Sequence, residues 1–317
     1  MSPIAWVFVL AGAVFAALYN VESKKVQTGH WKERSRALVF FHSGGAAVLL
    51  LLTSLASGGP QVQSGWLWPI VASGVLNVGI QFAKMRARSL EDVSLVSPID
   101  STTPAIVIFT SMVMLGEFPS TWGWLGIWLM VVGTYILNIE EAWKKLAEIV
   151  ASRKQESVQA VRWFEVYSAP FLALGKSVGV RWAFFACALS SISLNYDGLV
   201  ARRTDIGFGF GCVFAIAAIG NGIWAWQRRE FDGIDIRQAL KESRNLIVTL
   251  MLTNYITNWA FRHSIVPYVG TLKRLQIPLT IILAAWLLGE SKNLKDRLVG
   301  GTLMAIGAVL IALGGKP

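Results

Sequence analysis

Two adjacent cations, Lys273 and Arg274, lie within the strongly apolar stretch of residues 266–290, VPYVGTLKRLQIPLTIILAAWLLGE. The stretch is long and apolar enough to cross a lipid bilayer. Each cation within a membrane span costs roughly 2.5–3.5 kcal/mol on insertion scales, so such charges normally face a partner or a water-filled cavity. We therefore take Lys273 and Arg274 as candidate ligands for an anionic group in a buried site.

The same pattern occurs earlier in the chain, in residues 93–117, VSLVSPIDSTTPAIVIFTSMVMLGE. Both stretches end in Leu-Gly-Glu, and both have an interior proline, Pro104 or Pro278. A span with two glycines seven residues apart follows each stretch, at positions 126 and 133 and at positions 300 and 307. The prolines and glycines recur after 174 residues and the glutamates after 173, which indicates an internal duplication.

The offset of 174 residues aligns Asp100 with Arg274. Inverted repeats bring corresponding residues together about a pseudo-twofold axis near the middle of the membrane, where transporters bind their substrates. We therefore expect Asp100 to pair with Arg274, and Lys273 to remain available to bind an anion. The alternative is a structural clamp, in which the three charges only order the two helices.

Polar residues in other apolar stretches extend this candidate site. Asn254, Tyr255 and Asn258 share one face of a predicted helix and could line a cavity. We assign Tyr255 and Asn258 to the substrate-binding residues, with an interhelical hydrogen bond as the alternative role for each. His42 is a candidate carrier of a coupling proton, because the unperturbed pKa of histidine lies near neutral pH. A hydrogen-bonded structural histidine is the alternative.

Four prolines lie in the two duplicated stretches, at positions 98, 104, 267 and 278. A proline inside a helix removes one hydrogen bond and frees a backbone carbonyl. Within a membrane that carbonyl needs a hydroxyl group, water or a ligand. Serines and threonines at positions 97, 101, 102, 103 and 271 are placed to supply a hydroxyl. A kink without a role in binding is the alternative.

The composition is typical of a polytopic membrane protein, with 54% hydrophobic and 15% charged residues and a mean hydropathy of +0.52. We predict an all-α membrane protein with ten transmembrane helices in two inverted five-helix repeats, because an odd number of spans per repeat inverts the second copy. The predicted spans are residues 3–21, 38–57, 66–83, 91–115, 121–138, 181–200, 207–226, 245–262, 265–288 and 298–314.

The predicted repeats comprise residues 1–138 and 181–317. Residues 139–180 form an interfacial or cytoplasmic linker, whose uncharged run at 166–175 is too short to cross a bilayer. An eleventh span in this linker is the alternative.

Of the 29 lysines and arginines, 23 fall in the loops after the first, third, fifth, seventh and ninth spans, and four fall on the other side. The positive-inside rule then places both termini outside the cell. This bias also accounts for the net charge of +10, so we expect no nucleic acid as a partner.

Several kinds of catalysis have no counterpart in the sequence. It contains no nucleotide-binding loop, HExxH motif, Cys/His cluster or nucleophile elbow. We therefore predict that the protein is not an enzyme and uses no cofactor or metal.

The duplicated order of proline, Leu-Gly-Glu and paired glycines resembles the EamA-type branch of the drug/metabolite transporter superfamily, over the whole chain outside the linker. Residues 268–278, YVGTLKRLQIP, are similar to the stretch in which sugar-phosphate and nucleotide-sugar transporters place a Lys-Arg or Asn-Lys pair against the substrate. The resemblance implies that Lys273 and Arg274 are anion ligands, and Tyr268 joins the candidate substrate-binding residues. It also implies cytoplasmic termini, in contrast to the distribution of basic residues.

Together these expectations describe a secondary transporter that moves a small polar metabolite, with an anionic one favoured, by alternating access. The alternatives are an exporter of amino acids or neutral metabolites on the same fold and a lipid-linked sugar translocase subunit. The expected partners are the small-molecule substrate and the lipid bilayer, with coupling to a proton or a counter-substrate left open. We expect a monomer or homodimer in the bacterial inner membrane.

Overall fold

The computed structural model describes residues 2–27, 30–90, 98–152, 175, 177–288 and 298–315. Their helices are α1 (Pro3–Gln27), α2 (Ser35–Ala56), α3 (Leu67–Leu90), α5 (Thr103–Leu115), α6 (Thr121–Ser152), α8 (Val178–Arg203), α9 (Ile206–Gln227), α10 (Ile236–Trp259), α11 (Val266–Leu272), α12 (Gln276–Leu288) and α13 (Leu298–Gly314), with short 3-10 turns η1 (His30–Lys32), η4 (Ala260–Arg262) and η5 (Lys273–Leu275). Because α11, η5 and α12 follow one another directly, they count as one pass through the bundle. The eleven α-helices of the described residues therefore make ten passes.

Five helical segments in the described part of the chain are both long and apolar enough to cross a membrane: Pro3–Val26, Ser35–Ala56, Pro98–Leu115, Val178–Arg203 and Ile206–Gln227. Two shorter apolar segments, Thr121–Leu137 and Val299–Gly314, lie in α6 and α13. The predicted all-α membrane fold is confirmed.

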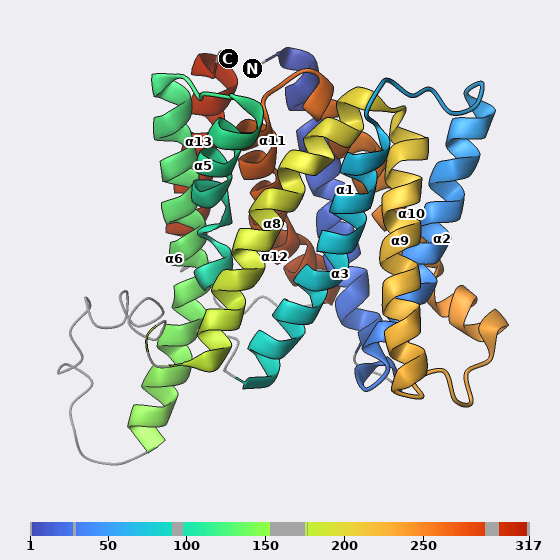
Figure 1. Ribbon diagram of the computed structural model, residues 1–317. Coiled ribbons are helices and arrows are strands. Elements are labelled where there is room, and N and C mark those ends of the chain that lie inside the picture. The colour runs from blue at the N-terminus through green and yellow to red at the C-terminus, as the bar shows by residue number, and fades with distance from the viewer. Residues whose placement is uncertain are drawn as a thin grey trace.

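The chain ends lie next to each other at one end of the bundle, which we call the terminal end (Figure 1). The opposite end, where α2, α8 and α10 begin, carries most of the lysines and arginines, and we call it the basic end. Helix α6 extends beyond the bundle at the basic end and stops there at Ser152 (Figure 1). Helix α8 begins at the same end (Figure 1). Most of the predicted linker lies outside the described residues.

The main helix interfaces join the two halves of the chain: α1 packs on α10, α2 on α9, α3 on α8, and α6 on α13. A Cβ at Gly126 would lie 2.6 Å from the carbonyl oxygen of Gly307, and one at Gly133 would lie 2.6 Å from that of Gly300. Residue numbers therefore rise along α6 as they fall along α13, so the two helices are antiparallel. Ten crossings require this arrangement, whereas an eleventh between them would make these helices parallel.

The close contact between α6 and α13 predicts that alanine has very different effects on stability at two neighbouring glycines. A Cβ at Gly300 would lie 2.7 Å from both the Gly133 carbonyl oxygen and Leu137 Cγ, whereas nothing lies within 4 Å of one at Gly301. We expect Gly300→Ala to destabilise the protein by about 1–3 kcal/mol through overpacking. The matched control, Gly301→Ala, should leave the melting temperature in detergent unchanged or raise it. Equal melting temperatures for the two variants would contradict the close approach.

Both duplicated spans are interrupted just before their interior proline. Ser101 and Thr102 form a turn before α5, and η5 separates α11 from α12. Pro104 cannot donate to the carbonyl of Asp100, and the Thr103 hydroxyl donates to that carbonyl instead, at 2.8 Å. A hydroxyl therefore replaces the missing bond, as the sequence predicted.

Three sequence-based expectations for the helices need correction. Pro267 does not kink a helix, because it lies in the first turn of α11, where no helical hydrogen bond is lost. Helix α10 begins at Ile236 instead of residue 245, since Asp235 caps a polar first turn by accepting from the Arg237 amide at 3.0 Å. Helix α6 continues to Ser152 through the charged start of the predicted linker.

Candidate substrate site

Lys273 lies in η5, where α11 gives way to α12. Its Nζ donates a hydrogen bond to Asn258 Oδ1 on α10, at 3.1 Å. The same Nζ lies 4.8 Å from the centroid of the Phe261 ring, a cation–π contact. The side chain is only partly buried. A lysine ammonium has three donor hydrogens, so the bond to Asn258 leaves it able to bind a further acceptor.

The amide of Asn258 is fully buried and only half satisfied. Its Oδ1 accepts from Lys273, but its Nδ2 is buried without a hydrogen-bond partner in the described part of the chain. Leaving a buried donor unpaired costs about 1–3 kcal/mol. A donor left unpaired beside a cation is suited to a ligand that brings oxygen acceptors and negative charge.

Asp197 on α8 is the carboxylate whose charge interacts with that of Lys273. Asp197 and Lys273 attract each other electrostatically, yet they form no direct ion pair among the described residues. Asp197 Oδ1 accepts a hydrogen bond from the Ser73 hydroxyl on α3. Asn77, one turn along α3, donates to the Ser73 carbonyl oxygen at 2.9 Å. Three helices and two short turns thus contribute to one polar cluster, which we call the Lys273 cluster: Ser73, Asp197, Asn258, Phe261 and Lys273.

The predicted ion pair between Asp100 and Arg274 is wrong. Asp100 Oδ1 lies 3.7 Å from Lys84 Nζ on α3 and accepts from the Cys187 thiol at 3.6 Å. The Arg274 side chain interacts electrostatically with Cys187 but makes no ion pair or hydrogen bond within the described ranges. The duplication aligned the two broken spans correctly, but α3 and α5 both pack against α8, and Lys84 is the cation that reaches Asp100.

The two charged groups lie at different depths. Eleven residues separate Ser73 from Lys84 along α3, which is about 16 Å at 1.5 Å per residue. Lys273 therefore belongs to the cluster nearer the terminal end, whereas its neighbour Arg274 is adjacent to the Lys84–Asp100 pair nearer the basic end.

Neither of the two predicted tyrosines hydrogen-bonds to a residue of the Lys273 cluster within the described ranges. Tyr268 is fully buried against α6, where its hydroxyl oxygen accepts from the Ser120 amide at 2.8 Å. Tyr255 is partly buried and packs against the main core. Asn254 donates to the carbonyl of Leu250 within its own helix, at 2.9 Å. Of the shared face predicted on α10, only Asn258 contacts Lys273.

His42 is buried with both ring nitrogens engaged. Nδ1 lies 2.7 Å from the carbonyl oxygen of Leu38 and Nε2 lies 3.0 Å from the Tyr19 hydroxyl. A carbonyl can only accept, so Nδ1 carries the proton and Nε2 accepts from Tyr19. These bonds favour the structural role for His42.

The sequence identifies Asp197 as one of several polar residues in apolar surroundings, with an interhelical hydrogen bond as its favoured role, but it assigns no role in the site to Ser73 or Phe261. One signal was available: Asp197 is the only acidic residue in the whole of α8. The duplication does not reveal the contact between Asp197 and Ser73, because the offset of 174 residues aligns Asp197 with Ser23, near the end of α1.

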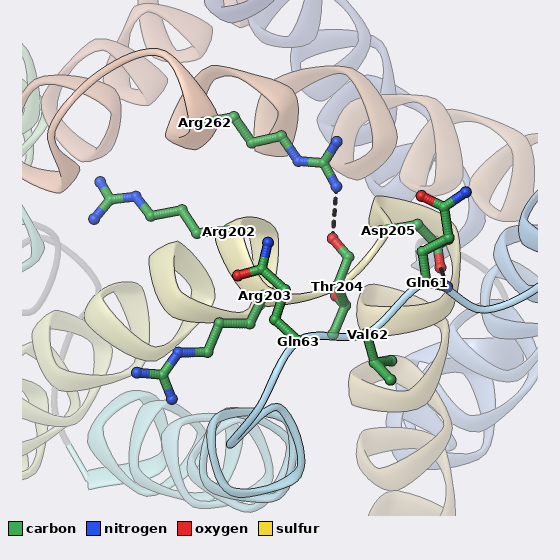
Figure 2. Close-up of a pocket in the computed structure, with 8 residues that line it drawn as sticks. All are labelled: Gln61, Val62, Gln63, Arg202, Arg203, Thr204, Asp205 and Arg262. Atoms are coloured by element: carbon green, nitrogen blue, oxygen red, sulfur yellow. Dashed lines mark hydrogen bonds between the residues drawn. The ribbon is translucent and has the colours of Figure 1, made fainter.

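A pocket of about 460 Å³ opens at the terminal end (Figure 2). It is lined by Gln61, Val62, Gln63, Arg202, Arg203, Thr204, Asp205 and Arg262. The Arg262 guanidinium donates to the carbonyl of Thr204 (Figure 2) and to that of Ala201. Arg202 donates to the carbonyls of Phe261 and Ser264. These arginines hold the loops of the terminal end together, so we do not assign them to a ligand.

Helices broken at interior prolines, with partly buried charges at the breaks, are an arrangement typical of secondary transporters. Residues 3–139 match the model of the EamA-like transporter family. This match confirms the predicted resemblance over the first half of the chain, and the apolar helices described above are those of a multi-pass membrane protein.

The fold as a whole also has a solved counterpart. A structure described as "Crystal structure of protein" superposes with a TM-score of 0.68 at 15% identity, covering 99% of this chain and 98% of the other. This likeness extends the shared fold over both halves of the chain. No curated protein sequence matches.

Proposed function

We propose that the protein is a secondary transporter that moves a small polar metabolite by alternating access. The metabolite carries a carboxylate or phosphate group, which Lys273 and Asn258 bind. The observation that carries this proposal is the unpaired Nδ2 of Asn258 beside Lys273 Nζ. A bound anion would satisfy that donor and the remaining hydrogens of the ammonium group. Such charge-assisted hydrogen bonds are roughly twice as strong as neutral ones.

An α-amino acid is a second candidate substrate, and the position of Asp197 favours it. Asp197 and Lys273 attract each other without direct contact, so opposite charges face the same region. A zwitterion could place its carboxylate on Lys273 and Asn258 and its ammonium group on Asp197. This candidate corresponds to the amino acid exporter considered from the sequence.

A thermal-shift screen of the purified protein tests both candidates. The compounds are carboxylated metabolites, phosphorylated metabolites and amino acids, each tested on wild type and on Asp197→Asn. A simple anion should stabilise Asp197→Asn at least as well as wild type, because a repelling charge is removed. An amino acid should lose its effect in that variant. No stabilisation by any of the three classes would count against both substrates.

We further propose that the basic end faces the cytoplasm, in a bacterial inner membrane, with both termini outside. The 23 lysines and arginines that the sequence assigns to the loops after the odd-numbered predicted spans support this orientation. In a cysteine-free background, Gln63→Cys at the terminal end should react with an impermeant maleimide on intact cells. Arg237→Cys at the basic end should react only after the cells are opened. Both positions are exposed, so the reverse pattern would establish cytoplasmic termini.

A further inference from the structure

A second pocket, of about 390 Å³, lies at the basic end between α2, α3 and α9. It is lined by Arg36, Phe82, Met85, Arg86, Ser89, Trp224 and Arg228. Three arginines from three different parts of the chain therefore face one hollow, together with two aromatic rings. The pocket shares no residue with the Lys273 cluster.

The pocket carries positive charge that the described residues do not neutralise. Arg36 is held in place by an ion pair with Glu230 and by stacking 4.6 Å over the Trp224 ring, while its Nε is buried without a partner. Arg86 and Arg228 are exposed, and neither guanidinium makes an ion pair or hydrogen bond in the described part of the chain. Glu230 offsets Arg36, so two positive charges remain.

Part of the pocket lining is apolar and aromatic. The rings of Phe82 and Trp224 lie with their centroids 4.8 Å apart, and Met85 lies beside them in the lining. The apolar span of α9 ends at Gln227, just before Arg228, and that of α2 begins at Ser35, just before Arg36. Trp226 on α9 is 74% exposed, as expected of a tryptophan at the membrane interface. The pocket therefore lies at the depth where lipid head groups meet the acyl chains.

We infer that this pocket binds a phosphate group at the membrane surface, presented either by an anionic phospholipid or by a soluble phosphate ester. Arginine suits this ligand because its planar fork donates two parallel hydrogen bonds to phosphate oxygens. The remaining charge matches a phosphate group, and the aromatic wall matches the start of an acyl chain. This site is independent of the proposed transport substrate, because neither Lys273 nor Asn258 contributes to it.

Titration of short-chain lipids into the detergent-solubilised protein tests the inference. Dioctanoyl-phosphatidylglycerol should bind and raise the melting temperature, whereas dioctanoyl-phosphatidylcholine should not. We expect Arg86→Gln and Arg228→Gln each to weaken phosphatidylglycerol binding about fivefold, and the double variant about 25-fold. The matched control is Arg237→Gln with Lys241→Gln, which removes two exposed charges at the same end outside the pocket. It should change the affinity by less than about twofold.

Competition with glycerol 3-phosphate separates the two sources of the phosphate. If millimolar glycerol 3-phosphate displaces the lipid, a soluble phosphate ester is sufficient to occupy the pocket. If the lipid stays bound, the anionic phospholipid is the ligand. Replacing Arg86 and Arg228 with lysine keeps the charge but removes the planar guanidinium donors, so weakened binding of phosphatidylglycerol is expected. Unchanged phosphatidylglycerol binding by the double glutamine variant, or an equal loss in the control, would overturn the inference.

Discussion

Lys273→Gln is expected to weaken substrate binding and transport by roughly 10- to 150-fold. This range corresponds to the 1.5–3 kcal/mol that a hydrogen bond to a charged group contributes. A glutamine amide can still donate to Asn258 Oδ1, so the variant mainly loses charge. Uptake into proteoliposomes of the compound found in the thermal-shift screen measures the loss.

Lys241→Gln serves as the control for this variant, because it removes an exposed lysine at the basic end, outside the Lys273 cluster. Lys273→Arg should retain part of the transport, since the charge remains but the donor geometry differs. Transport at the wild-type rate by Lys273→Gln would contradict the anion site and leave the charged residues as a structural clamp.

The stability of the same variants identifies the partner of Lys273. Lys273→Gln leaves the partly buried carboxylate of Asp197 without its nearby cation, so its melting temperature should fall. Combining it with Asp197→Asn should recover much of that loss, because a matched pair can be removed at little cost. The double variant Lys273→Gln with Asp100→Asn should show no such recovery, since Asp100 pairs with Lys84.

Glu117→Ala is expected to lower the free energy of unfolding by about 3 kcal/mol, because it removes two charge-assisted bonds at once. Glu117 Oε1 lies 2.6 Å from Arg202 Nη1, and Oε2 accepts from the Val266 amide at 2.7 Å, at the start of α11. The carboxylate is therefore both an ion-pair partner for α8 and a cap for α11. Unfolding followed by denaturant titration in detergent measures the change.

Two further substitutions separate these contributions. Glu117→Gln keeps an oxygen for the Val266 amide and loses only the charge, so a smaller loss than that of Glu117→Ala is expected. Glu22→Gln removes one partner of an exposed ion pair with Lys25 and should cost less than about 1 kcal/mol. A loss in Glu117→Ala no larger than in Glu22→Gln would show that the terminal end is held by other contacts.

The position of Glu117 also gives a reason for one Leu-Gly-Glu motif. Gly116 ends α5 with a φ of 65°, in the left-handed region that glycine adopts without strain. The chain can therefore turn sharply and direct Glu117 toward α11. The second copy of the motif, with Gly289 and Glu290, lies outside the described residues.

The local features of the fold were predictable from the sequence because they depend on neighbours along the chain. Apolar length predicted the crossings, and Pro104 and Pro278 predicted where two of them are interrupted. Partners across helices were not predictable in this way. Lys84 and Asp100 meet because α3 and α5 both pack on α8. The interaction of Asp197 with Lys273 likewise depends on the order in which the helices pack. The duplication identified equivalent residues, but equivalence by itself does not produce contact.

The packing of each half against the other has a consequence for biosynthesis. As the chain leaves the ribosome, α1, α2 and α3 enter the membrane before α10, α9 and α8, their main partners, have been made. A helix that is inserted before its packing partner must be stable alone in lipid. Helices α1 and α2 meet this requirement, because their apolar segments of 24 and 22 residues are long enough to cross the membrane. Helix α3 carries Lys84 and Ser73, whose partners Asp100 and Asp197 are translated later, so among these three helices its insertion depends most on segments made after it.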